Sequence, residues 1–232
     1  MIAVSTFRPH QKNAEYALNQ SRAVASWNGI FDEVFLIGKP EPELTYPCVS
    51  FLTGEEYPRI KDMILPLTIH DGWGAWINCD IVLTSPIKEV IRQMSIREYR
   101  ACTSQRFEYN PSYFPDLSNA QVPKNDYGLD IFITRGNVWL DMYHKIYPDL
   151  RKGGMVYDTW ITGYLWRTFG WGYRSFTNYR CVFHPKHEGR QKDFANSPQW
   201  IQDEYGIDAR IPPELEKERT VNRPRSVERL GI

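Results

Sequence analysis

A carboxylate interrupts an apolar stretch of this chain. Residues 74–84 read GAWINCDIVLT, and Asn78 and Asp80 flank Cys79 in a run that otherwise predicts a buried strand. Burying a carboxylate is costly unless it is hydrogen-bonded, paired with a charge or bound to a metal. Because alternate residues of a strand point to the same side, Asn78 and Asp80 are expected to face one site at the strand's carboxyl end. Their oxygens suit a hard divalent cation that carries substrate phosphates.

A structural role for Asp80 would explain the same segment without any ligand. Thr84, Ser85 and Pro86 follow closely and form a good helix start, so Asp80 could serve as a turn or helix-capping residue. The metal interpretation therefore depends on what the rest of the chain places beside Asp80.

Alternating strands and helices surround this segment. Short apolar runs predict strands, and apolar residues at helical spacing predict helices. The predicted strands are residues 1–7, 33–37, 49–52, 74–84, 100–104, 130–134 and, more weakly, 173–183. The predicted helices are residues 11–27, 57–69, 86–98, 137–147 and 158–169. This order favours an α/β domain with a mixed, mostly parallel sheet flanked by helices.

Two segments do not follow this alternation. Residues 106–125 are rich in Pro, Asn, Tyr and Asp and lack a clear period, which predicts a long loop of the kind that is usually functional or mobile. After His184 the chain turns polar. We expect one domain over residues 1–200 and a polar C-terminal extension over residues 201–232.

The composition is that of an ordinary globular protein. The 28 basic and 28 acidic side chains cancel, so no net field favours nucleic acid or an anionic membrane. The 4 cysteines are widely spaced without a CxxC pair, which argues against a zinc knuckle or a dense disulfide framework. No secretory or membrane-spanning apolar run is visible, so a reduced, cytoplasmic compartment is expected. The aromatic content of 14% permits a sugar or nucleotide site.

The order of these elements resembles the GT-A class of nucleotide-sugar-dependent glycosyltransferases over residues 1–188. Residues 76–81, WINCDI, are similar to the aspartate-any-aspartate motif that binds metal and diphosphate in that class, with Asn78 at the first acidic position. The resemblance implies a GT-A-like fold in a single domain and a UDP- or GDP-sugar as donor. It also implies that Asp80 is the direct metal ligand, and that Asn78 helps at the metal or contacts the ribose.

The same resemblance assigns polar side chains to donor binding. Residues 4–8 occupy the place where such enzymes hold the nucleotide, which implicates Thr6 and Arg8. Residues 57–62 begin the helix before the metal strand and contain Arg59 and Lys61. Lys186 would neutralise the leaving diphosphate.

A late histidine completes the metal shell in many GT-A enzymes. His184 and His187 lie together in residues 181–188, CVFHPKHE, and either would join Asp80 around a Mn²⁺ or Mg²⁺ ion. A surface-loop histidine is the alternative for each. The spacing around Pro185 favours a loop over a pair of ligands on one helix.

Two further carboxylates are candidates for catalysis by resemblance. Residues 126–132 resemble the segment that lines the acceptor side, which makes Asp130 a catalytic candidate, unless it only ends a turn that enters a strand. Residues 153–160 resemble a glycine-then-acid loop, and Asp158 there is the first choice for the base that takes the acceptor proton. Asp158 would also suit the N-cap of the next helix, and the two roles are compatible.

The expected reaction moves a sugar from its nucleotide to an acceptor hydroxyl, with inversion or retention left open. The acceptor could be a glycan, a lipid carrier, a protein or a modified nucleic acid. A metal-dependent nucleotidyltransferase or phosphoesterase is a rival, although the chain has no GxGxxG or GxxxxGK[ST] loop. A non-catalytic sugar-binding module is another, in which Trp160, Trp166 and Trp171 would be stacking surfaces and not core residues.

Overall fold

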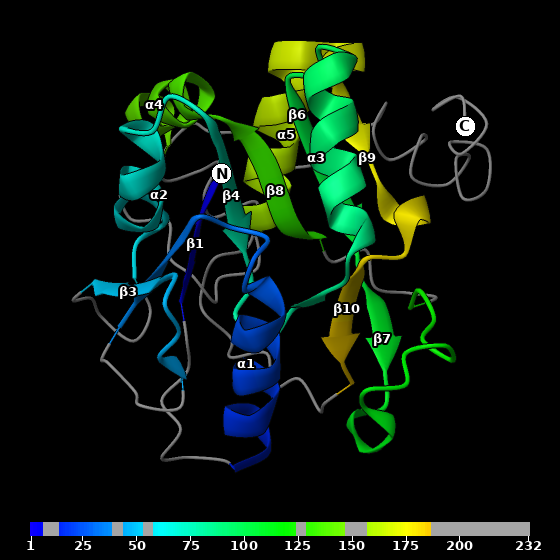
Figure 1. Cartoon of the computed structure of the whole chain (residues 1–232). Helices are drawn as coiled ribbons and strands as arrows, with labels where there is room; N and C mark the ends of the chain where they lie inside the picture. The colour runs from blue at the N-terminus through cyan, green and yellow to red at the C-terminus, as the bar shows by residue number, and fades with distance from the viewer. Residues whose placement is uncertain (7–13, 39–43, 53–57, 124–128, 147–156, 187–232) are drawn as a thin grey trace, which may run out of the picture.

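The computed structural model describes residues 1–6, 14–38, 44–52, 58–123, 129–146 and 157–186. Their centre is a seven-stranded sheet in the order β3-β2-β1-β4-β8-β6-β9, with helices on both faces (Figure 1). Only β8 runs antiparallel to its neighbours in this sheet. The predicted mixed, mostly parallel α/β sheet is therefore confirmed. Its strands are β1 (Ile2–Thr6), β2 (Glu33–Ile37), β3 (Val49–Leu52), β4 (Trp73–Ile77), β6 (Ala101–Gln105), β8 (Leu129–Arg135) and β9 (Tyr173–Ser175).

The direction in which the chain adds strands reverses between β1 and β4. β2 and β3 extend the sheet on one side of β1, and β4 then pairs with the other side of β1. The carboxyl ends of β1 and β4 are joined directly, since Ser5 Oγ donates to the carbonyl oxygen of Ile77 at 2.6 Å. Open α/β sheets bind ligands beyond the carboxyl ends of the strands at such a reversal.

Helices cover the sheet in two groups, each with its own core. On one face lie α2 (Ile60–Thr68), α4 (Gly136–Lys145) and α5 (Tyr157–Phe169), and on the other lie α1 (Ala14–Trp27) and α3 (Pro86–Ile96). β4 serves both cores: Trp76 packs with the first group, and Ala75 and Ile77 pack with the second. Since successive side chains of a strand face opposite ways, a strand covered on both sides must be apolar throughout.

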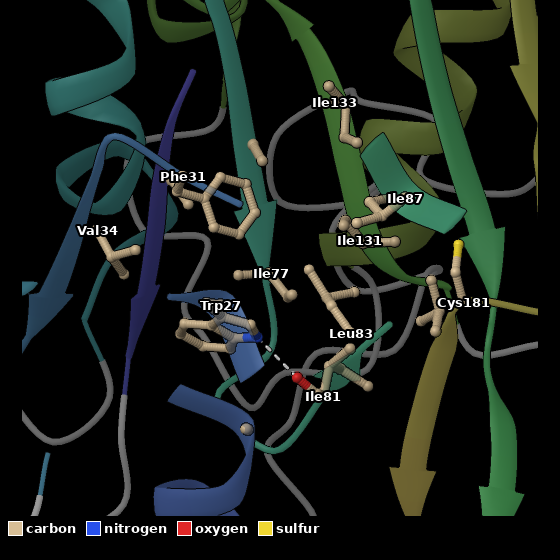
Figure 2. Packing of buried hydrophobic residues seen from close by; sticks show 14 of the residues in the cluster. Trp27, Phe31, Val34, Ile77, Ile81, Leu83, Ile87, Ile131, Ile133 and Cys181 are labelled. Atoms are coloured by element: carbon tan, nitrogen blue, oxygen red, sulfur yellow. Dashed lines mark hydrogen bonds between the residues drawn. The ribbon is translucent and has the colours of Figure 1, made fainter. Parts of the chain in front are cut away.

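The second core is anchored where α1 meets the end of β4. Figure 2 shows Trp27 packed among Phe31, Val34 and Ile77, with its indole nitrogen donating to the carbonyl oxygen of Ile81 at 2.8 Å. The hydrogen bond fixes the chain just beyond Asp80. The segment that carries the candidate carboxylate is therefore held by a buried side chain of α1.

A three-stranded sheet lies beyond the carboxyl ends of the parallel strands of the large sheet. It contains β5 (Val82–Leu83), β10 (Val182–Pro185) and β7 (Phe107–Tyr109) in the order β5-β10-β7. Figure 1 shows β10 and β7 side by side, below the end of α3. The loop predicted over residues 106–125 contains β7 and a short 3-10 turn, Pro111–Tyr113, because β7 finds its partner far along the chain in β10. The single strand predicted over residues 173–183 is divided between β9 and β10, which belong to different sheets.

The proposed extension over residues 201–232 lies outside the described residues. Within the described part, no helix combines the length and the apolar character needed to cross a membrane.

Candidate functional site

Asn78 and Asp130 meet at the end of β4. The backbone N–H of Asn78 donates to the carbonyl oxygen of Asp130 at 2.9 Å, which prolongs the pairing of β4 with β8. The side-chain amide of Asn78 also donates to Oδ1 of Asp130. An ionised carboxylate only accepts hydrogen bonds, so this contact orients the amide and turns Oδ1 of Asn78 away from Asp130.

Arg106 holds the other oxygen of Asp130. Its Nη1 donates to Oδ2 at 3.0 Å, and its Nη2 lies 3.4 Å from Oε1 of Glu108. Asp130 is only 5% exposed, and a carboxylate buried to that degree depends on a paired charge and on donors to replace water. Two side chains therefore hold Asp130 in place: Asn78, which follows β4, and Arg106, which follows β6.

Asp80 and His184 form the second pair of this site. Nε2 of His184 lies 3.4 Å from Oδ2 of Asp80. Burial acts to lower the pKa of His184, but the nearby carboxylates of Asp80 and Asp130 outweigh it, so the pKa of His184 is raised above its usual value. His184 pairs in register with Glu108 between the parallel strands β10 and β7, so both side chains leave the small sheet on the same face. That face is turned toward Asp80 and Asp130.

The start of α5 is attached to the same place. The ring of Tyr157 stacks on Trp76 of β4 with centroids 4.9 Å apart and an interplanar angle of 29°. The Tyr157 hydroxyl donates to Oδ1 of Asn78 at 3.4 Å, the oxygen that the contact with Asp130 leaves turned outward. Asp158 follows directly in the first turn of α5. The candidate base thus belongs to a helix turn that is anchored on the site.

The expected geometry of residues 78–80 was wrong in one respect. The strand ends at Ile77, and the backbone N–H of Ile81 donates to the carbonyl oxygen of Asn78 at 3.2 Å, which closes a turn between β4 and β5. The alternation of a strand therefore does not apply to Asn78 and Asp80. Asn78 contacts Asp130 and Tyr157, while Asp80 faces His184. The turn is required because the chain changes from one sheet to the other at this point.

The remaining predicted site residues are placed with less connection to this cluster. Thr6 is buried at the carboxyl end of β1, beside β4. Arg59 is exposed at the N-cap position of α2, and the Lys61 ammonium lies 4.6 Å from the ring centroid of Tyr143, a contact between α2 and α4. Lys186 is exposed just after β10. Arg8 and His187 lie outside the described residues.

Arg106, Glu108 and Tyr157 belong to the site but were not among the predicted residues. Arg106 lies two residues after the predicted strand 100–104, which places it near a strand end but does not reveal its partner. Tyr157 immediately precedes the predicted helix that begins at Asp158. Glu108 could not be found in this way, because its strand was predicted as loop.

Two side chains of the site carry the kinds of atom that bind divalent cations. Asp80 and His184 present a carboxylate oxygen and an imidazole nitrogen to one another. Among the residues that the structure describes, no group of three or more His, Cys, Asp or Glu side chains is arranged to hold a metal. A cation bound largely through substrate phosphates is usually held by only one or two carboxylates of the protein.

Comparisons with known proteins find likeness in structure only. No known sequence family matches the chain, and no curated protein sequence does. A glucose-1-phosphate thymidylyltransferase from Bacillus anthracis, in complex with a sucrose, is 9% identical, with 81% of this chain and 87% of the other covered at a TM-score of 0.47. A 4-diphosphocytidyl-2C-methyl-D-erythritol synthase from Anaerococcus prevotii DSM 20548 is 12% identical, with 86% and 92% covered at a TM-score of 0.41. The function is therefore inferred from the side chains of the site.

Proposed function

We propose that this chain is a nucleotide-sugar-dependent glycosyltransferase whose donor diphosphate binds beyond the carboxyl ends of β1 and β4. The observation that carries the proposal is the convergence of five polar side chains from separate segments at the reversal of the strand order. These are Asn78, Asp80, Arg106, Asp130 and His184. Structural turn and capping roles would not require buried and half-buried charges from four segments to meet at one edge of the sheet.

Asp80 and His184 are the residues that would hold a Mn²⁺ or Mg²⁺ ion. When bound, such an ion neutralises charge on the diphosphate as it leaves. Asp130 is less suited to this task, because Arg106 and Asn78 already occupy its two oxygens. Asp130 instead orients Asn78, whose Oδ1 then accepts from Tyr157. We assign Asn78 to the ribose or to the donor sugar and not to the cation.

Asp158 is the proposed base if the enzyme inverts the anomeric centre. The bond between the anomeric carbon and the phosphate oxygen breaks, and its electron pair leaves with the nucleoside diphosphate. The acceptor oxygen forms the new bond to that carbon and gives its proton to the Asp158 carboxylate. The contacts of Tyr157 with Trp76 and Asn78 support this role, because they hold the turn that carries Asp158 against the site. A retaining enzyme would use the same donor residues without this base.

A nucleotidyltransferase is the second candidate, favoured by one observation. Asp80, Asp130 and Glu108 bring several carboxylates to one edge of the sheet, as that chemistry often requires. The pairing of Asp130 and Glu108 with Arg106 counts against it, because both acids already have a cationic partner in the fold.

One assay separates these activities. The purified protein is incubated with UDP- or GDP-sugars and Mn²⁺, and release of nucleoside diphosphate is measured by slow hydrolysis without acceptor. In parallel, it is given a nucleoside triphosphate and a sugar 1-phosphate, and pyrophosphate release is measured. We expect diphosphate release with one donor and no pyrophosphate. Pyrophosphate release alone would establish the nucleotidyltransferase instead. If no donor binds or is turned over, both proposed activities are contradicted.

A further inference from the structure

The small sheet has an apolar face and a polar face. Its apolar face is formed by the buried side chains of Val82, Phe107, Tyr109, Ala120 and Phe183. On the other face, His184 of β10 lies in register with Glu108 of β7, and both belong to the candidate site. Sheets commonly pack one face on a core and leave the other to solvent. The polar face is therefore the one on which this sheet can meet a ligand.

Gln121 continues this polar row by one position. The backbone N–H of Glu108 donates to the carbonyl oxygen of Gln121 at 2.8 Å, and the N–H of Gln121 donates to the carbonyl oxygen of Glu108 at 3.0 Å. Two residues that exchange both bonds lie directly opposite each other, with their side chains on the same face. Because His184 pairs with Glu108 from the other side of β7, the three residues form one row, about 5 Å apart.

The outer part of the row is accessible. The Gln121 side chain is exposed, whereas its neighbour Ala120 is buried on the apolar face. The Glu108 side chain is 25% exposed. A ligand at the candidate site can therefore reach both groups from solvent.

The row leads away from the place proposed for the nucleotide. The donor diphosphate is assigned to the carboxyl ends of β1 and β4, where Asp80 lies 3.4 Å from His184. β7 begins after Arg106, which follows β6, and β6 lies two places from β4 on the side away from β1. Figure 1 shows β10 and β7 on the opposite side of β4 from β1. The row thus lies where an acceptor would approach the donor sugar.

The groups in the row suit a sugar. The Glu108 carboxylate accepts hydrogen bonds, and the Gln121 amide both donates and accepts, as sugar hydroxyls do. A lipid would not find apolar surface here, because the apolar side chains of the small sheet face the other way. A polyanion would be repelled by the carboxylates of Asp80, Glu108 and Asp130, since the guanidinium of Arg106 already pairs with two of them.

We propose that Glu108 and Gln121 bind hydroxyl groups of a saccharide acceptor whose reacting hydroxyl lies toward Asp80 and His184. This inference rests on the proposed function and narrows the acceptor to one chemical class. The mutual backbone bonds of the two residues hold both side chains in place before the acceptor arrives, which lowers the cost of binding. The segment predicted as a loop thereby supplies acceptor-binding residues.

The test is Gln121→Met, which removes the amide and keeps the length of the side chain. The p-nitrophenyl glycosides of glucose, galactose, mannose, xylose and N-acetylglucosamine are offered as acceptors, with MnCl₂ and the sugar nucleotide that the wild type hydrolyses. Transfer is followed by chromatography of the nitrophenyl product. We expect the KM for the accepted glycoside to rise by about fivefold, as for loss of one hydrogen bond. The KM for the sugar nucleotide should stay close to the wild-type value.

Glu108→Gln is the second variant and keeps an oxygen for Arg106. It should also raise the KM for the glycoside by about fivefold, because a bond to a charged acceptor becomes a bond to a neutral one. Asn119→Leu is the matched control. Asn119 is exposed in a turn that the N–H of Ala120 closes on the carbonyl oxygen of Leu117 at 3.1 Å, outside the paired row. This variant should leave both KM values unchanged.

Three results would overturn the inference while the proposed function stands. The KM for the glycoside could be unchanged in Gln121→Met and Glu108→Gln, which would mean that the acceptor does not contact the row. It could rise equally in Asn119→Leu, which would mean that any polar side chain of this segment has the same effect. The wild type could hydrolyse a donor and use none of the glycosides, which would mean that the acceptor is not a saccharide. If no UDP- or GDP-sugar is hydrolysed, the proposed function and this inference are contradicted together.

Discussion

Asn78 stands where the resembling glycosyltransferases carry an acid, and its neighbours give a physical reason for the amide. Asp130 lies within hydrogen-bond contact of the Asn78 side chain. A carboxylate at position 78 would face the buried carboxylate of Asp130, whereas an amide donates to it. At the scale of single residues, an amide at position 78 therefore suits the charge already present on β8.

Asn78→Asp, which would create an aspartate-any-aspartate sequence, should therefore destabilise the protein. We expect the free energy of unfolding to fall by about 2 kcal/mol at pH 7, because two ionised carboxylates in contact repel each other. Urea unfolding at pH 7 measures the loss. The exchanged pair, Asn78→Asp with Asp130→Asn, should recover part of the loss, and no recovery would contradict the direct contact.

At the scale of elements, α5 depends on β4 for the position of its first turn. The stack of Tyr157 on Trp76 and the hydrogen bond to Asn78 are the contacts that join the two elements at the site. An aromatic pair of this kind contributes about 1 kcal/mol beyond its buried area. Its larger effect is geometric, because Asp158 is the next residue along the helix.

Tyr157→Leu should consequently impair turnover more than donor binding. We expect kcat for sugar transfer to fall by about tenfold or more, because catalysis is sensitive to small displacements of the base. Affinity for the nucleoside diphosphate should change little. Tyr157→Phe keeps the ring and should retain most of the activity. Equal losses of kcat in the two variants would show that the hydroxyl, and not the stack, positions α5.

The packing of α2 against α4 depends on a glycine at the start of α4. A Cβ on Gly136 would overlap the backbone carbonyl oxygen of His70, and no rotamer change can move a backbone atom. Gly136→Ala should lower the free energy of unfolding by about 3 kcal/mol, at the upper end of overpacking costs. Gly29→Ala is the comparison: nothing lies within 4 Å of its Cβ, but its φ is 72°. That backbone strain alone should cost about 1–2 kcal/mol. A smaller loss for Gly136→Ala than for Gly29→Ala in urea unfolding would contradict the close approach.

At the scale of the whole molecule, the site lies where strands pass from the large sheet to the small one. The chain leaves β4 through the turn that contains Asn78 and Asp80, and it then enters β5. It leaves β6 through Arg106 and enters β7 directly. Polar side chains are found at these crossings because the strands on either side must be apolar to be covered on their faces. The site is thus a product of the two-sheet architecture.

The sequence predicts the strands of the large sheet well and the small sheet poorly. β2 and β3 have the predicted bounds, because their apolar runs signal strand without any partner. β5, β7 and β10 are two to four residues long and pair with segments far away in the sequence, so local pattern holds little information about them. Pro66 lies within α2, where packing of Ile64 and Leu67 in the core outweighs the tendency of proline to end a helix.

The sequence likewise predicted only part of the candidate site, because contacts between distant segments leave no local pattern. Asp80 was identified as a carboxylate within an apolar run, and Asp130 and His184 from segments that resemble a family. The structure brings the three together. The role of Arg106 could not be predicted, because its partner Asp130 is 24 residues away and is reached only through the antiparallel pairing of β6 with β8. Their roles in metal binding and catalysis stay proposals.

Metal-dependent nucleotide binding by the wild type, Asp80→Asn and Asp71→Asn tests directly whether Asp80 holds a cation. Asp71 is exposed just before β4, at the opposite end of the strand from Asp80, and serves as the matched control. Calorimetry with UDP and GDP, with and without MnCl₂, should show Mn²⁺-dependent binding of one nucleotide to the wild type and to Asp71→Asn. Asp80→Asn should lose that dependence, with affinity in Mn²⁺ reduced by about tenfold or more. Unchanged Mn²⁺-dependent binding by Asp80→Asn would contradict the central claim.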